Sequence, residues 1–413
     1  MSKIVKLTLL FFLVLSFLNI NGCHRQNQDN PKQPVLLIGF DGFCYEYLEK
    51  TELPNLNFLI HTGVRAPLIP VFPSKTFPNF YTIVTGLYPE KHGIVANNMY
   101  DPQMDARFSL GNRQAVTDAR WWGGEPIWVT AARHGLLTAT YFWVGSEAPI
   151  QGLHPTYWFP YDDSTPNEKR IQQVFQWLDL PYEKRPAFIA VYFDLLDDAG
   201  HEWGPNSPEL LKTLKRADEL VGMLTDGLKK RHLLEKINLL IVSDHGMAEI
   251  SPERVIFLDD YIDLNTVEIE GGSPLLGIWP KQNNVTAIYK KLVHAHPHLK
   301  IYRKNETPER FHYRNHRRIP PIVGLADEGW SIGTHESFRT HPQYYRGGNH
   351  GFDPQLPSMR GIFIARGPAF KSGLKLPPLE NIHLYNLMCF LLNIPPAPND
   401  GNFEKIKIML ENN

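Results

Sequence analysis

Short apolar runs that alternate with amphipathic segments are the feature that most constrains the fold of this chain. The apolar runs are residues 35–40, 187–193, 237–242 and 361–365. The helical patterns between them include residues 53–61, 171–178 and 209–230. Fully apolar strands that alternate with helices are typical of a mostly parallel sheet that is covered on both faces. The sequence therefore predicts an α/β domain with helices on both faces of one large sheet.

Acidic residues and histidines follow three of the predicted strands. Asp41 follows the first, Asp194 and Asp197 follow the second, and Asp244 with His245 follows the third. In open α/β sheets, ligands bind beyond the carboxyl ends of the strands. We therefore expect a functional site at this edge of the sheet.

The composition changes between about residue 251 and residue 343. This stretch is more charged and richer in proline, its strand signals are weaker, and it contains a cluster of Arg and His over residues 310–318. We interpret it as a cap inserted over the site, with the core resuming at Gly347. The catalytic domain is then expected to span residues 34–396, followed by a C-terminal tail over residues 397–413.

The N-terminus has the pattern of an export signal. Lys3 and Lys6 precede an apolar run over residues 7–17, which is shorter than the roughly 20 residues that span a bilayer. The residues Ile20-Asn21-Gly22-Cys23 resemble the processing site of bacterial lipoproteins. Residues 1–23 would then be a lipoprotein-type signal peptide, Cys23 the lipidated first residue, and residues 24–33 a polar tether.

The alternative is an ordinary cleaved signal in which Cys23 has no role. The lipoprotein interpretation predicts an exported protein, periplasmic or on the cell surface, with the outer membrane as one location for its lipid anchor. Two further cysteines, Cys44 and Cys389, are too few for a disulfide framework in a domain of this size. We expect both to pack in the core.

The charge balance predicts no general electrostatic attraction to nucleic acid. Lys and Arg total 42 against 43 Asp and Glu, which leaves a formal charge of -1. An anionic substrate must therefore be held by local charge, such as that of a metal site. We expect a small-molecule partner and no sequence-specific binding of nucleic acid.

One hydroxyl group allows two interpretations. Thr76 stands in the segment Pro73-Ser74-Lys75-Thr76-Phe77-Pro78-Asn79, where a helix should begin. The structural interpretation is a threonine that caps this helix, and the segment alone favours it. The functional interpretation is a nucleophile, because a helix N-terminus and a bound cation both stabilise an alkoxide.

Six Asp and His residues, together with Thr76, have the types and spacing of metal ligands. They are Asp41, the pair Asp197 and His201 four residues apart, the adjacent pair Asp244 and His245, and His350 between glycines. Oxygen and nitrogen donors without a thiolate favour paired Zn²⁺, with Mn²⁺ second and Mg²⁺ disfavoured by three imidazoles. Two such ions about 3.5–4 Å apart clamp the attacking and leaving oxygens of an in-line displacement at phosphorus.

Longer segments carry a family resemblance. They include Trp121-Trp122-Gly123-Gly124-Glu125-Pro126-Ile127-Trp128, Ala326-Asp327-Glu328-Gly329-Trp330, and residues 85–90, 92–94, 97–102, 311–313 and 317–321. With the metal motifs, they make the chain similar to the nucleotide pyrophosphatase/phosphodiesterase family of the alkaline phosphatase superfamily, from about residue 34 to residue 396. The resemblance implies an alkaline-phosphatase-like fold with an inserted cap subdomain.

The resemblance also implies a role for each ligand. One zinc ion would be held by Asp197, His201 and His350. The other would be held by Asp41, Asp244 and His245, with Thr76 bound to it as the nucleophile. The family pattern further gives Asn97 the role of a donor to a nonbridging phosphate oxygen.

For the substrate, the resemblance implies that Phe77 and Trp158 form the two walls of a nucleobase slot, which Tyr192 also lines. Family members usually carry Tyr where Trp158 stands, and the register could slip by one residue. Phe77 directly after Thr76 favours diesters over monoesters, and the formylglycine motif of the sulfatases is not found in this sequence.

The function predicted is hydrolysis of nucleotide phosphodiester or pyrophosphate bonds to 5′-nucleotides through a covalent threonine intermediate, with two zinc ions per chain. One alternative is a phosphodiesterase of lysophospholipid or choline-phosphate esters. A second alternative is a non-catalytic surface lipoprotein that keeps the fold for binding.

Overall fold

The computed structural model describes residues 34–411, without the side chain of residue 283. The expected signal peptide, the tether and Cys23 lie outside the described residues. Within residues 34–411, no helix combines the length and the apolar character needed to cross a bilayer.

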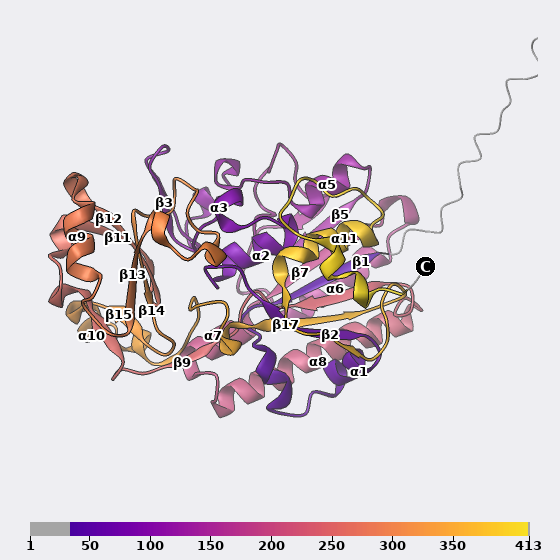
Figure 1. The fold of residues 1–413 in the computed structure, drawn as a ribbon. Coiled ribbons are helices and arrows are strands. Elements are labelled where there is room, and N and C mark those ends of the chain that lie inside the picture. The colour runs from indigo at the N-terminus through magenta and orange to yellow at the C-terminus, as the bar shows by residue number, and fades with distance from the viewer. Residues whose placement is uncertain (1–33, 412–413) are drawn as a thin grey trace, which may run out of the picture. The chain divides into compact units, whose positions relative to one another are not determined.

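A large mixed sheet forms the centre of the fold (Figure 1). Within the described residues it has nine strands in the order β18-β2-β17-β8-β1-β7-β5-β6, with β19 beside β2. Its strands are β1 (Val35–Phe40), β2 (Val64–Ile69), β5 (Thr138–Tyr141), β6 (Tyr157–Phe159), β7 (Phe188–Phe193), β8 (Asn238–Val242), β17 (Gly361–Arg366), β18 (Leu374–Lys375) and β19 (Leu379–Glu380). The expectation of a mostly parallel sheet is confirmed, since only β17 runs antiparallel to its neighbours β2 and β8.

Helices cover both faces of this sheet, as the sequence predicts. Leu37 of β1 packs in a core cluster with side chains of α2, α5 and α11, whereas Leu36 packs in a second cluster with side chains of α1, α6 and α8. The two expected core cysteines are buried, Cys389 in the first cluster and Cys44 in the second. The helices are α1 (Pro54–His61), α2 (Thr76–Thr85), α5 (Ile127–Arg133), α6 (Asn167–Leu178), α7 (Leu195–Trp203), α8 (Pro208–Lys230) and α11 (Leu384–Leu391).

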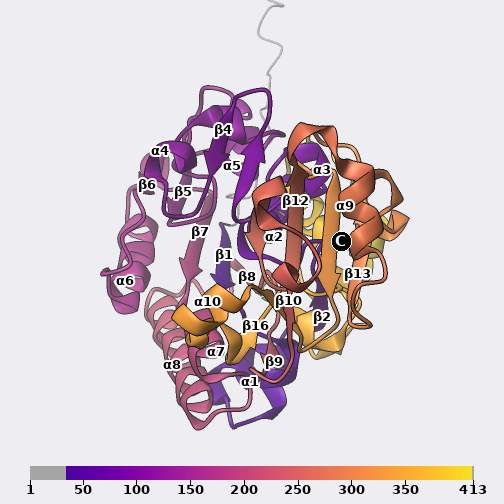
Figure 2. The same cartoon turned by 90° about the vertical axis from the view of Figure 1, so that its left-hand side faces the viewer.

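A second sheet lies in a long insertion between β9 (Ala248–Ile250) and β16 (Gly347–Asn349), which pair with each other. This sheet is antiparallel in the order β11-β12-β14-β13 and has its own small core with α9. Figure 1 shows the insertion in orange to one side of the large sheet, and in Figure 2 the insertion faces the viewer. Its elements are β10 (Val255–Phe257), β11 (Val267–Gly272), β12 (Leu275–Pro280), α9 (Val285–Leu292), β13 (Leu299–Arg303), β14 (Ile322–Ala326), β15 (Ser331–Gly333) and α10 (His335–Thr340). It occupies the stretch that the sequence suggested as a cap.

The chain after residue 396, which we expected to form a tail, packs on the domain. Ile406 and Met409 are fully buried in the cluster that contains α2 and α11. The backbone N–H groups of Lys371 and Glu411 donate to the carbonyls of Met409 and Ala369, each at 3.0 Å. Residues up to 411 are therefore part of the folded domain.

The register of the sheet sets where the site forms. Phe40 at the end of β1 lies opposite Phe193 at the end of β7, and Gly39 lies opposite Val242 at the end of β8. Since these strands are parallel, the residues that follow them meet at one edge of the sheet, as the sequence analysis expected.

Candidate active site

Asp41, Asp244 and His245 meet at the carboxyl edge of the sheet. His245 Nε2 lies 3.3 Å from Asp41 Oδ1 and 3.0 Å from Asp244 Oδ2. All three side chains are buried, with at most 2% of each exposed. They therefore form one of the two Asp and His groups among the described residues that could hold a metal ion.

The second group adjoins the first and contains Asp197, His245 and His350. His350 Nε2 lies 3.7 Å from Asp197 Oδ1, and the rings of His245 and His350 stack at 3.5 Å. His201 contacts the same aspartate from the next turn of α7, with 3.4 Å between its Nε2 and Asp197 Oδ2. The structure thus brings the six Asp and His ligands expected from the sequence into one continuous cluster.

The three histidines are oriented as metal ligands usually are. Each places Nδ1 at 2.9 Å from a backbone carbonyl: Gly348 for His201, Gly246 for His245 and Ser74 for His350. Because a carbonyl oxygen only accepts hydrogen bonds, Nδ1 carries the proton in each ring. In the neutral ring, Nε2 then keeps a lone pair for the cluster. Burial lowers the pKa of His350 well below its ordinary value, which keeps that ring neutral.

The carboxylates of the cluster also fit a cation. Asp41 Oδ1, Asp197 Oδ1 and Asp244 Oδ2 are buried and accept no hydrogen bond from any described residue. Burial and the neighbouring carboxylates of Asp244 and Asp197 raise the pKa of Asp41 well above its ordinary value. Buried, unpaired carboxylates are unfavourable unless a cation neutralises them. This donor set, with imidazoles and without thiolate, fits zinc.

Thr76 is the first residue of α2 and does not cap it. The N-cap position is occupied by Lys75, whose side chain makes no capping hydrogen bond. The Thr76 hydroxyl instead lies 3.3 Å from His245 Nε2, and the residue is 7% exposed. The structure therefore does not support the cap interpretation and places the hydroxyl beside the Asp41, Asp244 and His245 group.

Asn97 lies next to the start of the same helix. Its side-chain oxygen accepts a hydrogen bond from the backbone N–H of Phe77 at 2.9 Å. Since the backbone N–H can only donate, this contact identifies the oxygen of the amide. The Asn97 amide nitrogen therefore remains available to donate to a bound group.

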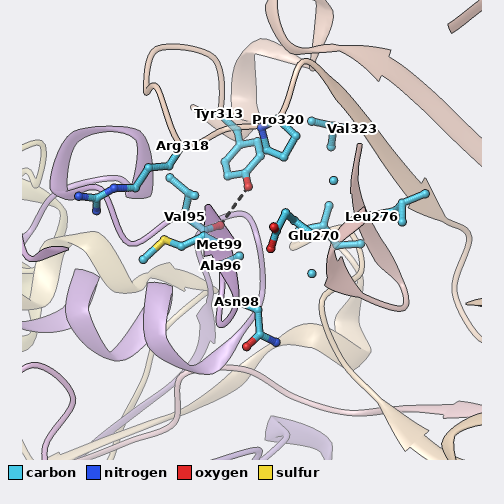
Figure 3. A pocket seen from close by; sticks show the side chains of 13 residues that line it. Val95, Ala96, Asn98, Met99, Glu270, Leu276, Tyr313, Arg318, Pro320 and Val323 are labelled. Atoms are coloured by element: carbon cyan, nitrogen blue, oxygen red, sulfur yellow. Dashed lines mark hydrogen bonds between the residues drawn. The ribbon is translucent and has the colours of Figure 1, made fainter. Parts of the chain in front are cut away.

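The insertion holds the loop that carries Asn97 (Figure 3). The Tyr313 hydroxyl donates to the carbonyl of Val95 at 3.0 Å, and the Arg318 guanidinium donates to the carbonyl of Gly93 at 2.7 Å. Both side chains are at most 3% exposed, and Arg318 is further fixed by an ion pair with Asp101 at 2.7 Å. Both residues stand in the expected cap motifs, but this role could not be predicted from the sequence, because the bonded residues are 218 and 225 positions apart.

The aromatic residues expected to form the base slot pack against different neighbours in the structure. Trp158, inside edge strand β6, stacks on His154 with 4.7 Å between ring centroids. Phe77 is half-buried against Phe108 and Trp122. No ring pair among residues 34–411 joins Trp158 to Phe77 or to Tyr192. In the structure, Trp158 thus packs on His154 at the sheet edge and not on Phe77 or Tyr192.

A different aromatic residue, Tyr161, lies beside Tyr192. The centroids of the two rings are 6.4 Å apart, and the Tyr161 hydroxyl lies 3.1 Å from Asp194 Oδ2. Tyr192 in turn donates to Asp41 Oδ2 at 2.6 Å, and Tyr161 is 39% exposed. The sequence did contain a signal for it, because Tyr161 comes two residues after the end of β6, and Asp41 likewise comes after the end of β1.

The chain matches the family model described as type I phosphodiesterase / nucleotide pyrophosphatase over residues 35–353. It belongs to this family. Two relatives are a venom phosphodiesterase of Naja atra and the human ectonucleotide pyrophosphatase/phosphodiesterase family member 5. The first is 42% identical over 92% of this chain and 47% of the relative. The second is 38% identical over 97% of this chain and 83% of the relative. The chain thus spans about half the length of the venom enzymes that it matches.

Solved structures of this family superpose on the fold. An inactive variant of murine ectonucleotide pyrophosphatase / phosphodiesterase 5, in complex with AMP, has a TM-score of 0.88 and 37% sequence identity. The superposition covers 92% of this chain and all of the murine chain. The family resemblance and the alkaline-phosphatase-like fold expected from the sequence are therefore confirmed.

Proposed function

We propose that this protein is a zinc-dependent nucleotide phosphodiesterase/pyrophosphatase that releases 5′-nucleotides and uses Thr76 as its nucleophile. The observation that carries the proposal is the cluster itself. Three histidines with Nδ1 bonded to carbonyls, three unpaired carboxylate oxygens and one hydroxyl converge at the carboxyl edge of the sheet. The AMP complex of the murine relative supports a nucleotide as the substrate.

The cluster has enough donors for two ions. In the proposed division, Asp197, His201 and His350 hold one zinc ion, and Asp41, Asp244 and His245 hold the other together with Thr76. When bound, the two ions act as Lewis acids on the attacking and the leaving oxygen. Tyr192 orients Asp41 through its 2.6 Å hydrogen bond to Oδ2, which leaves Oδ1 for the ion.

The residues of the chain then act in two steps. The Thr76 oxygen attacks the α-phosphorus, the bond to the leaving group breaks, and a nucleotidyl-threonine ester forms. Water hydrolyses this ester, which releases the 5′-nucleotide and restores the hydroxyl. The Asn97 amide donates to a nonbridging phosphate oxygen as its charge develops, and the Phe77 N–H holds Asn97 in place.

For the base slot, we propose that Tyr161 rather than Trp158 is the second wall beside Phe77. A stacked aromatic side chain contributes about 1–3 kcal/mol per base. Tyr161→Ala should therefore lower kcat/KM for ATP by about 5- to 150-fold. Trp158→Ala, the matched change in the same segment, should alter it less than about 2-fold, and steady-state kinetics of both variants measure the difference.

A substrate without a base, nitrophenyl phenylphosphonate, is the control for this comparison. Its loss in Tyr161→Ala should be clearly smaller, because the cluster and Thr76 act on the phosphoryl group whichever group is attached. If Trp158→Ala but not Tyr161→Ala lowered kcat/KM specifically for ATP, Trp158 and not Tyr161 would be the second wall of the base slot. A loss confined to a choline or lysophospholipid ester would move the assignment to the lipid-directed alternative.

We further propose that the chain is exported and anchored by a lipid on Cys23. The names of the venom and ecto-type relatives support export, and the motif before Cys23 supports the lipid anchor. Cys23→Ser should move the protein from the membrane fraction to the soluble fraction, or leave it unprocessed, as measured by fractionation and intact mass. Unchanged membrane attachment with normal processing would show that another element anchors it.

A further inference from the structure

A cavity of about 1000 Å³ adjoins the Asp197, His201 and His350 group. His201 and its neighbours on α7 line one side, Gly348 and Asn349 beside His350 line another, and the insertion supplies the rest. The His201 side chain is 40% exposed. Phe77, Asn97 and Tyr161 do not line the cavity, so it is separate from the proposed base slot.

The cavity has an apolar floor and a polar rim. Leu258, Leu276 and Ile332 are buried side chains of the floor. At the rim, Tyr344 is 63% exposed, with its ring parallel to that of His341. Arg346 is exposed and makes no hydrogen bond or ion pair with its side chain to any described residue.

Two acidic residues of α7, Asp198 and Glu202, line the side next to His201. Both are exposed. These carboxylates offer hydrogen-bond acceptors, and the guanidinium of Arg346 offers donors that fit a phosphate group. The lining is therefore mixed in charge, with two carboxylates and one guanidinium.

The in-line geometry of the proposed reaction connects this cavity to the substrate. In such a displacement, the nucleophile and the leaving group lie on opposite sides of phosphorus. Thr76 lies with Asp41, Asp244 and His245. The leaving group therefore departs beside Asp197, His201 and His350, where the cavity opens.

We propose that this cavity binds the leaving group, and that its residues favour a leaving nucleoside phosphate over inorganic pyrophosphate. The inference rests on the proposed function. Arg346 would bind the phosphates through charge-assisted hydrogen bonds, and Tyr344 would stack on the second base. Asp198 and Glu202 would accept hydrogen bonds from ribose hydroxyls. The volume also fits, since nucleotide-sized ligands occupy pockets of about 300–1,000 Å³.

With diadenosine triphosphate as the substrate, the first step breaks the bond between the α-phosphorus and its bridging oxygen. The adenylyl group is transferred to the Thr76 oxygen, whose proton goes to solvent, and ADP leaves with the bridging oxygen and its electron pair. Water then releases AMP. Because the AMP-threonine ester is the same for every AMP-transferring substrate, differences in kcat/KM report the leaving group alone.

Three substrates with the same AMP group separate the contributions. The nitrophenyl ester of AMP has a leaving group without phosphate, ATP has one without a base, and diadenosine triphosphate has one with both. Arg346→Ala should lower kcat/KM about 5- to 20-fold for ATP and for diadenosine triphosphate but not for the ester. Tyr344→Ala should lower kcat/KM about 5- to 10-fold for diadenosine triphosphate only. This value is in the lower part of the range for base–aromatic stacking, because the ring is exposed.

Arg339→Ala on α10 and Tyr182→Ala are the matched controls, since both residues are exposed and neither lines the cavity. They should leave all three rates unchanged. Provided that the wild-type protein cleaves all three substrates, two results would overturn the leaving-group assignment. One is an equal loss of kcat/KM on the three substrates, and the other is no loss in either cavity variant. A selective loss on a choline ester would assign the cavity to a cation instead. A wild-type protein that cleaves none of the nucleotides would instead refute the proposed function.

Discussion

Thr76→Ala is expected to reduce nucleotide turnover by about 10⁴-fold or more, in line with removal of the nucleophile from other hydrolases that act through a covalent intermediate. The physical reason is that no other described hydroxyl lies within hydrogen-bond distance of His245 Nε2. Both metal sites should persist, because the six Asp and His ligands remain. The measurements are steady-state rates, metal content and the intact mass of the wild-type protein quenched during turnover, which should show an AMP adduct.

Two further variants make this experiment specific. Thr76→Ser keeps a hydroxyl and should recover a large part of the activity. Asn97→Ala should lower kcat by about 10²–10³, as the loss of one oxyanion donor does, whereas Asn98→Ala, at the exposed neighbouring position, should be close to wild type. If Thr76→Ala turned over near the wild-type rate with its metals bound, water would be the direct attacker and the threonine mechanism would be wrong.

Removal of metal is expected to abolish activity almost completely. The purified protein should contain about two zinc ions per chain, because three imidazoles and three carboxylates converge in one cluster. After exhaustive chelation, Zn²⁺ should restore activity and Mg²⁺ should not, since imidazole ligands disfavour magnesium. Elemental analysis and rates during titration with each ion provide the test.

The same experiment has a readout that does not depend on activity. A ligand that binds only the folded state stabilises it by about 4 kcal/mol at a thousandfold excess over its Kd. The metal-free protein should therefore unfold at a lower temperature than the protein with zinc, and His350→Ala should reduce both zinc content and this shift. Full activity of a protein verified to be free of metal would rule out the two-metal mechanism.

The sequence alone determined the α/β class and the edge of the sheet that carries the cluster. Residues 35–40, 187–193 and 237–242 form β1, β7 and β8 within one residue of the expected bounds. The reason is local, because a strand buried on both faces has a continuous apolar pattern. The residue that follows such a strand must also lie at the carboxyl edge of the sheet. Asp41 and Asp244 could therefore be found from position and residue type.

Only the tertiary structure decided the features that depend on contacts between distant segments. Because α2 starts at Thr76 and Lys75 occupies the N-cap position, the Thr76 hydroxyl does not cap the helix and is free to take part in the site. The place of Trp158 inside β6 and of Tyr161 beyond it, beside Tyr192, is the basis for proposing Tyr161 as a wall of the base slot. The hydrogen bonds of Tyr313 and Arg318 to the loop of Asn97 join residues more than 200 positions apart. Apolar periodicity reports only on the few residues of one helix or strand, so it contains no information on which distant segment a side chain will contact.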